Sequence, residues 1–365
     1  MKRLVLTSII GLLPSLSHAT GLNFWESSTV NSSMASANGA IATDASILAL
    51  APSSITQLNS PTVTANVTFY EVTTDYDLFG AETQYKQSDP IPAGFFATPL
   101  NDNWSAGLAI YSRTAADISI PQISVIIPLT DETRVRPITV SVAPTLAYRW
   151  SQVSFAATLE YLYTEYELYQ TKCGFRGCND SKQKDTTSGF SGALSATWIV
   201  NPNLSVAANH KFATQYSDNN IQLELPSITS LYATWRATKN LDWHFSYSYT
   251  DWDGKGIRYS DYSDPFGLLV GTQNSNRLAT SVEYRLSDWS FRTGISADEA
   301  IDAFGGIDYR YRFGIGYRFT DNLQGDFSAV FEDYARKEYN TSTGTNLIAV
   351  QNDGTAIGLG LTYNF

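Results

Sequence analysis

Charged residues are scarce in this chain of 365 residues, in which Asp, Glu, Lys and Arg together make up only 16%. The net charge at pH 7 is −11, which argues against a nucleic-acid partner because such partners reward clustered Lys and Arg. After residue 20 no apolar run is long enough to form a membrane-spanning helix. This composition is unusual for a soluble enzyme, so the organisation of the chain has to be found in its pattern.

Residues that perform catalysis or bind metals are also few. The chain has three His, and only His210 and His244 follow residue 20. Asp242 could orient the imidazole of His244, but no Ser can be assigned as a nucleophile, and no Gly-x-Ser-x-Gly elbow, phosphate-binding loop or set of metal ligands is present. We therefore expect no enzymatic activity, no cofactor and no metal; a lipid hydrolase that uses His244 is the disfavoured alternative.

The first 19 residues have the pattern of a secretory signal peptide. Lys2 and Arg3 provide a basic start, residues 4–16 an apolar segment, and residues 17–19 a small-x-small cleavage site. A short core helix is the weaker interpretation, because the basic residues stand at the very start. We expect the mature protein to begin at Thr20 and to be exported.

Cysteine is nearly absent, and the two that occur, Cys173 and Cys178, lie in the sequence Cys-Gly-Phe-Arg-Gly-Cys. Their spacing and the predicted export favour a local disulfide bond that closes a loop. A pair of metal ligands is the weaker alternative, because no His or further Cys lies nearby to complete a site.

Aromatic residues, in contrast, are abundant at 13%, and many alternate with polar residues or glycine. Between Tyr309 and Phe319 every odd position is apolar, whereas the even positions are Arg or Gly. Successive side chains of a strand point to opposite faces, so this segment has one fully apolar face and one cationic or bare face. A membrane barrel turns the apolar face to lipid and keeps the charges inside. The chain ends on a similar strand, as expected for a barrel that closes on its last strand.

The same alternation predicts about fourteen strands within residues 61–365, an even number as in single-chain bacterial barrels. The predicted strands are 61–72, 91–99, 104–112, 140–150, 153–168, 187–200, 203–216, 221–238, 241–252, 275–286, 289–298, 306–320, 322–338 and 353–365. Short turns alternate with mostly longer connections, and six of the eight Trp lie close to the short turns. This arrangement is typical of a barrel with aromatic belts at both membrane interfaces.

Residues 20–60 differ from the rest of the chain. They are rich in Ser, Ala, Asn and Gly, contain no basic residue and show no period-two alternation. One interpretation is a flexible leader on the periplasmic side. The sharper one is a compact segment of short helices that folds inside the barrel as a plug.

Two motifs in this segment resemble the N-terminal hatch of the FadL/TodX family of outer-membrane transport proteins. They are residues 21–28 (GLNFWESS) and residues 35–46 (ASANGAIATDAS), the second of which ends in Asp44, Ala45 and Ser46. The Asn-Pro-Ala that usually follows in the family is here Ala51-Pro52-Ser53, so the Pro is kept and the Asn is lost. Residues 144–149, 225–227, 241–252 and 291–296 also resemble strand segments of the family.

This resemblance implies a monomeric fourteen-stranded barrel in the bacterial outer membrane, surrounded by lipid and lipopolysaccharide. It implies passive uptake of long-chain fatty acids or other hydrophobic compounds, with N-terminal residues such as Leu22 and Phe24 capping a ligand pocket. It also implies sideways release into the membrane through a kink in the third strand, near residues 104–112, where Gly107 would tolerate a bend.

Period two also predicts which charges face the lumen, since Arg or Lys facing the middle of the lipid would cost about 2–4 kcal/mol. The predicted lumenal charges are Glu160, Lys211, Arg236, Arg277, Glu283, Arg285, Arg292, Arg310, Arg312, Arg318, Asp326 and Glu332. One interpretation is an internal ion-pair network that braces barrel and hatch. In the other, Arg292, Arg310 and Arg312 on neighbouring strands bind a carboxylate, with Lys211 as a weaker candidate.

The sequence therefore predicts a channel for hydrophobic molecules, with long-chain fatty acids as the preferred ligand. Alkanes and aromatic hydrocarbons would also suit an apolar tunnel. A water-filled porin is the main alternative, supported by the lumenal charges alone, although a porin has no need of an N-terminal plug.

Overall fold

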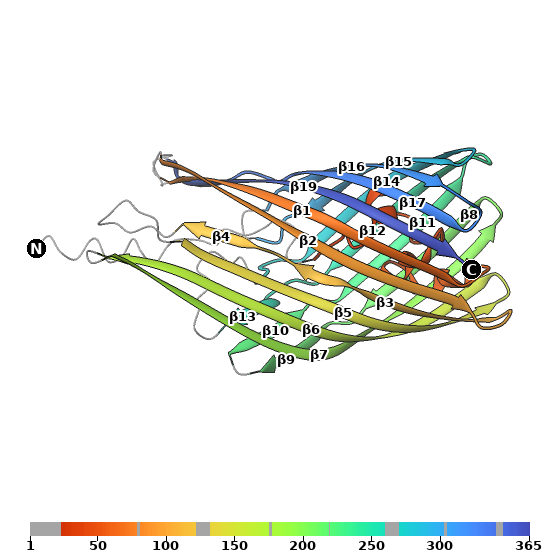
Figure 1. Ribbon diagram of the computed structural model, residues 1–365, viewed down its shortest axis with the longest axis horizontal. Coiled ribbons are helices and arrows are strands. Elements are labelled where there is room, and N and C mark those ends of the chain that lie inside the picture. Colours follow the sequence, from red (N-terminus) through yellow and green to blue (C-terminus); the bar gives the residue numbers. More distant parts are fainter. Residues whose placement is uncertain are drawn as a thin grey trace, which may run out of the picture.

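The structure is a computed structural model that describes residues 23–78, 81–121, 132–174, 177–218, 220–259, 270–302, 305–340 and 346–365. The predicted signal peptide and Leu22 lie outside these residues. Fourteen antiparallel strands form a closed barrel, in which the last strand pairs with the first along its whole length (Figure 1).

The strands of the wall follow one another in chain order. They are β1 (Thr62–Leu78), β2 (Ala81–Pro99), β3 (Trp104–Ala115), β5 (Glu132–Trp150), β6 (Val153–Gly174), β7 (Gly177–Asn201), β8 (Leu204–Lys211), β11 (Ile228–Arg236), β12 (Leu241–Thr250), β14 (Ser275–Leu286), β15 (Trp289–Glu299), β16 (Ile307–Arg318), β17 (Leu323–Asp333) and β19 (Asn346–Asn364). Two short strands extend it: β4 (Ile118–Pro121) pairs with β5, and β18 (Lys337–Asn340) pairs with β19. No helix of the described residues is long and apolar enough to cross a membrane.

The period-two prediction of faces is confirmed in the wall. On β16, Tyr309, Tyr311 and Phe313 are 40–53% exposed, whereas Arg310 and Arg312 are buried in the lumen. The six Trp near the short turns are likewise exposed on the outer face. Arg236 and Arg318 are exposed, because they lie at the ends of their strands next to short turns, but Arg236 still approaches the buried Asp242 at 3.5 Å.

The predicted fourteen strands are confirmed in number, but two of them are interrupted. The predicted strand 203–216 becomes β8 and β9 (Thr214–Asp218), and 221–238 becomes β10 (Ile221–Leu225) and β11. Pro226 follows β10 and has no N–H to continue a ladder. β9 and β10 leave the wall and form a separate sheet with β13 (Gly256–Tyr259). Leu223 and Leu225 of β10 and Ile257 of β13 belong to a buried apolar cluster.

The hairpins β1–β2 and β6–β7 are longer than predicted, because segments 73–90 and 169–186 were expected to be loops. The ladders run on through these segments to within a few residues of each turn. In these segments the outward face becomes polar, while inward residues such as Tyr76 and Leu168 stay apolar and buried, so the lipid-facing alternation on which the prediction depends ends before the strand does.

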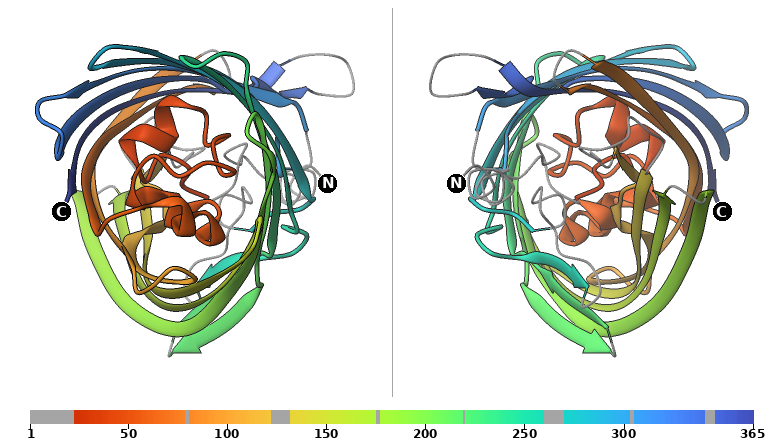
Figure 2. Two further views of the ribbon diagram at one scale, coloured as in Figure 1. Left: turned by 90° about the vertical axis from the view of Figure 1, so that its right-hand side faces the viewer. Right: turned by 90° about the vertical axis from the view of Figure 1, so that its left-hand side faces the viewer.

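The plug interpretation of the N-terminal segment is the correct one. Figure 2 shows the segment enclosed by the ring of strands. It contains α1 (Thr29–Ser33), η2 (Ala45–Ala49) and η3 (Pro52–Gln57). We call residues 23–60 the hatch.

The bare face of β16 receives the hatch. An added Cβ at Gly314 would lie 2.3 Å from Cβ of Ser33, so glycine is what lets α1 approach the wall. On the other side of the lumen, Leu48 and Ile55 pack among Phe95, Ala109 and other small wall residues. The hatch is therefore packed against the barrel on several sides.

Candidate functional site: a break in the barrel wall

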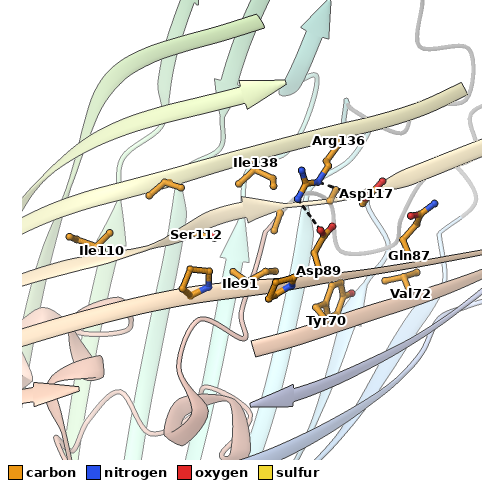
Figure 3. Close-up of a pocket in the computed structure, with 15 residues that line it drawn as sticks. Tyr70, Val72, Gln87, Asp89, Ile91, Ile110, Ser112, Asp117, Arg136 and Ile138 are labelled. Atoms are coloured by element: carbon orange, nitrogen blue, oxygen red, sulfur yellow. Dashed lines mark hydrogen bonds and ion pairs between the residues drawn. The ribbon is translucent and has the colours of Figure 1, made fainter. Parts of the chain in front are cut away.

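The barrel wall has a break between β2 and β3. The two strands pair from Pro99↔Ser105 up to Gly94↔Ile110 and no further. Beyond that point β2 continues to Ala81 with β1 as its partner, and β3 continues to Ala115 with β5 as its partner. We call the unpaired region beyond Gly94 and Ile110 the lateral gap (Figure 3).

Two prolines explain where the ladder ends. The N–H of Leu100 donates to the carbonyl of Trp104 across the β2–β3 turn, at 2.7 Å. Because backbone groups alternate in direction along an antiparallel strand, the even-numbered residues of β2 direct theirs toward β3. The next even residues after Gly94 are Pro92 and Pro90, which have no N–H to donate. On β3 a register shift between Ser112 and Thr114 interrupts the regular ladder with β5 at the same level.

Gly107 does not form the kink that we expected of it. It stays in the ladder opposite Ala97, and a Cβ there would lie 2.7 Å from Cδ2 of Leu48. Its role is to give the hatch room, and the break begins at Ile110, near the end of the predicted range 104–112.

A pocket of about 230 Å³ occupies the lateral gap. Its lining combines lumenal side chains such as Tyr70 and Ile91 with outward-facing ones such as Ile110 and Ile138 (Figure 3). Side chains from both faces of the wall therefore line this pocket, which lies within the wall at the break, and most of its lining is apolar.

A second, smaller pocket of about 40 Å³ lies on the lumenal side and shares Tyr70, Val72, Ala115, Ala116 and Asp117 with the first. The remaining residues of its lining are Asn23, Phe24, Glu26, Arg310, Glu332 and Tyr334. The two pockets are therefore neighbours, and they lie between the start of the hatch and the outer surface of the barrel.

The start of the hatch lies on the edge of β3 that β2 leaves unpaired. Asn23 forms a β-bridge with Thr114, and the N–H of Phe24 donates to the carbonyl of Arg113 at 3.3 Å. The ring of Phe24 packs edge-on against Tyr70, with 5.8 Å between ring centroids. Of the two residues that we expected to cap a pocket, Phe24 does line one; Leu22 lies outside the described residues.

The three arginines that we favoured as a carboxylate site are each held by carboxylates of the protein. Arg292 binds Glu283 and Asp326 at 2.8 and 2.6 Å, and Arg310 binds Asp298 and Glu332 at 2.6 Å each. Arg312 binds Glu26 of the hatch at 2.8 Å, and Arg277 lies over the ring of Trp25 at 4.6 Å. This geometry is that of the bracing network, and only Arg310 reaches a described pocket.

Lys211, the weaker candidate, has the most suitable surroundings for a ligand carboxylate. Its Nζ donates to the Tyr111 hydroxyl at 2.9 Å, and no carboxylate oxygen lies within 4 Å of it among the described residues. Arg113 is buried nearby and pairs with Glu160, which also accepts a hydrogen bond from Tyr111. Nη2 of Arg113 has no hydrogen-bond partner in the described part of the chain. Two cations thus share one carboxylate, which leaves a net charge of +1.

The hatch residues of the family motif are engaged in hydrogen bonds and packing. Asp44 caps η2, accepting from the N–H of Ser46 at 2.7 Å, and the N–H of Ala45 donates to Thr64 of β1 at 3.2 Å. Burial raises the pKa of the Asp44 carboxyl, and the hydrogen bonds from Ser46 oppose that shift. Pro52 opens η3, where Ala51 provides no side-chain cap in the place of the family's Asn.

The residues considered for hydrolysis do not form a catalytic pair. His244 is buried in the lumen with Nδ1 2.9 Å from the Thr234 hydroxyl. Asp242 pairs with Arg285 at 2.8 Å and not with His244. Among the described residues, no group of three or more His, Cys, Asp or Glu is placed to hold a metal ion.

The predicted disulfide lies at the tip of the β6–β7 hairpin. Cys178 is disulfide-bonded, and Cys173, the only other cysteine of the sequence, is opposite it in the strand register. The bond would close the turn that joins the two longest strands of the wall.

Sequence and structure comparisons agree on the relatives of this chain. Residues 11–188 match the sequence model described as outer membrane protein transport protein (OMPP1/FadL/TodX). The fold is similar to that of a Pseudomonas aeruginosa FadL homologue, with a TM-score of 0.77, 14% identity and coverage of 94% of this chain and 100% of the other. The P. putida toluene transporter TodX gives a TM-score of 0.77 at 14% identity, covering 94% and 99%.

A structure named CymD monoaromatic hydrocarbon channel gives a TM-score of 0.68 at 13% identity, covering 93% and 97%. No curated protein matches the chain by sequence. The family model, the closed fourteen-stranded barrel and the enclosed hatch lead to one conclusion: the chain belongs to the FadL/TodX family of transport proteins of the bacterial outer membrane.

Proposed function

We propose that this protein is a passive channel of the bacterial outer membrane. Hydrophobic molecules enter it from outside the cell and leave sideways into the membrane. The observation that carries this proposal is the lateral gap, where the ladder between β2 and β3 ends and an apolar pocket is lined by residues of both faces of the wall. A water-filled porin needs neither a break in its wall nor a hatch packed into its lumen. The related structures named for toluene and monoaromatic hydrocarbons support a hydrophobic cargo.

Within this function we propose long-chain fatty acids as the cargo, with Lys211 and Arg113 as the polar anchor. A carboxylate needs donors that are not already satisfied, and Nη2 of Arg113 is buried without a partner. Arg113 lies next to the start of the hatch, because its backbone carbonyl accepts the N–H of Phe24, and Lys211 is linked to it through Tyr111 and Glu160. A ligand bound there would lie beside the segment that has to move before the lateral gap opens to the lumen.

The test is the binding of labelled oleate to the purified protein in detergent, with toluene as competitor. Saturable binding that toluene does not displace is expected, together with a loss of about tenfold in affinity for Lys211→Met, which removes one charged hydrogen bond. Arg318→Gln, an exposed cation at a strand end, is the control and should bind as the unsubstituted protein does.

Displacement by toluene with no effect of Lys211→Met would contradict the fatty-acid proposal and favour neutral hydrocarbons. No binding of either compound, in a barrel that still migrates in the heat-modifiable manner of a folded protein, would contradict the channel for hydrophobic molecules as a whole.

A further inference from the structure

Side chains cross the lateral gap where the backbone ladder does not. Nη2 of Arg136 on β5 donates to Oδ1 of Asp89 on β2 at 2.9 Å (Figure 3). Nε2 of Gln87, also on β2, donates to the hydroxyl of Ser119 on β4 at 2.8 Å. At this level the chain that follows β3 still runs along β5, where the N–H of Ala116 donates to the carbonyl of Pro137 and β4 begins, but among the described residues it forms no ladder with β2.

The ion pair of Asp89 and Arg136 passes through the wall. Residues with odd numbers on β2, such as Ile91 and Ala93, face the lumen, and Asp89 belongs to this set. On β5 the odd-numbered Val135 is buried in the lumen, so Arg136 faces outward. A carboxylate on the lumenal face of β2 and a guanidinium on the outer face of β5 meet here because no ladder joins β2 to the described part of the chain that follows β3.

We propose that the Asp89–Arg136 ion pair and the Gln87–Ser119 hydrogen bond form a latch that holds the lateral gap closed and opens when a hydrophobic molecule leaves. The proposal rests on the proposed lateral release and adds the residues that regulate it. The latch crosses the pocket whose apolar lining includes Ile91, Ile138 and Val140. Opening it would widen the outer end of the lateral gap above that lining without breaking any backbone ladder.

The geometry of the pair suits a contact that has to open and close repeatedly. The side chains of Arg136 and Asp89 are 29% and 25% exposed, so water can solvate both when they part. Arg136 also lies 3.7 Å from Asp117, which can hold its charge after Asp89 is released. A fully buried pair such as Arg292–Asp326 has neither property and is suited to bracing.

The first experiment measures the initial rate of labelled oleate uptake by cells that produce each variant as their only protein of this family. Asp89→Asn and Arg136→Gln should each raise the rate about two- to fivefold, the range expected for loss of a half-exposed ion pair. The exchange Asp89→Arg with Arg136→Asp restores the pair and should return the rate toward that of the unsubstituted protein.

The control is Glu71→Gln, which removes the ion pair of Glu71 with Lys86 at 2.8 Å between β1 and β2. These two strands share an unbroken ladder at that level, so the rate should not change. The thermal midpoint of heat-modifiable migration is measured for every variant. A lower midpoint for Asp89→Asn with an unchanged rate would show a structural contact only and would overturn the latch.

The second experiment separates the latch from lateral release itself. Gln87→Cys with Ser119→Cys places a thiol on each side of the lateral gap, and oxidation should block uptake until a reductant is added. Uptake that continues through the oxidised variant would contradict lateral release. A different result would overturn the latch alone. In that result oxidation blocks uptake, which supports lateral release, but Asp89→Asn and Arg136→Gln take up oleate at the rate of the unsubstituted protein.

Discussion

The ion pair of Glu26 and Arg312 gives the sharpest prediction about what keeps the hatch in the barrel. Arg312 is fully buried and Glu26 is 3% exposed, with 2.8 Å between Nη2 and Oε1. Among the described residues, the guanidinium of Arg312 donates one further hydrogen bond, from Nη1 to the hydroxyl of Ser296 at 2.8 Å. Glu26→Gln would therefore leave a buried positive charge without its carboxylate.

Removing one partner of a buried ion pair costs about 3–5 kcal/mol, which corresponds to a change on the order of 10²- to 10³-fold in an equilibrium constant. We expect the population of protein with a displaced hatch to rise by about this factor in Glu26→Gln. Single-channel conductance in planar bilayers would record it as frequent large openings, which the original protein should show rarely.

The double variant Glu26→Gln with Arg312→Met removes both charges and should close the channel again for most of the time, because no buried charge is left unpaired. Arg318→Gln, which changes an exposed charge, should behave as the original protein does. A closed, quiet channel in Glu26→Gln would refute the reasoning that this pair anchors the hatch.

Three further predictions concern the hatch and its contact with the wall. Gly314→Ala should lower the thermal midpoint of the folded barrel, because the new Cβ would lie 2.3 Å from Ser33 and overpacking costs about 1–3 kcal/mol. Gly94→Ala, where the new Cβ has nothing within 4 Å, should leave the midpoint unchanged. Equal midpoints for the two variants would contradict the close contact of α1 with β16. Burial raises the pKa of Asp44, so the docked hatch binds a proton more tightly than the released hatch does, and docking should weaken as the pH rises above about 3.9. Asp44→Asn retains the cap and should remove this dependence of docking on pH, as measured by conductance across a pH series. Deletion of residues 20–58 should produce a wide and permanent leak in bilayers, and a conductance equal to that of the full chain would instead favour a porin.

Much of the architecture could be predicted from the sequence because a lipid-facing strand has a strict alternation. The alternation of odd and even positions alone predicts the correct faces for Tyr309, Phe313 and Gly314. The structure adds the reason for the glycine at 314, which gives α1 the space to approach β16. The limits of the prediction follow from the same physics. Where strands leave the membrane, as in β6 beyond Tyr163, the outer face becomes polar while Tyr166 and Leu168 stay buried on the inner face, so the lipid-facing signal is lost.

The site was harder to predict than the fold. Which lumenal cations are already paired depends on contacts between distant strands, so Arg292, Arg310 and Arg312 could not be distinguished from Lys211 by position in the sequence. The lateral gap does have a signal in the sequence. Pro90 and Pro92 stand two residues apart, so that both lack an N–H on the same edge of a strand, and this pattern marks an edge without a partner.

Those two prolines have a further consequence for how the protein behaves among its neighbours. An unpaired strand edge is a template on which another chain can add a strand, and such edges lead to aggregation. Most closed barrels avoid the hazard by having no edge, but the break between β2 and β3 exposes one. At Pro90 and Pro92 that edge offers no N–H to an incoming strand, so the barrel can keep an opening in its side without recruiting unfolded chains during assembly.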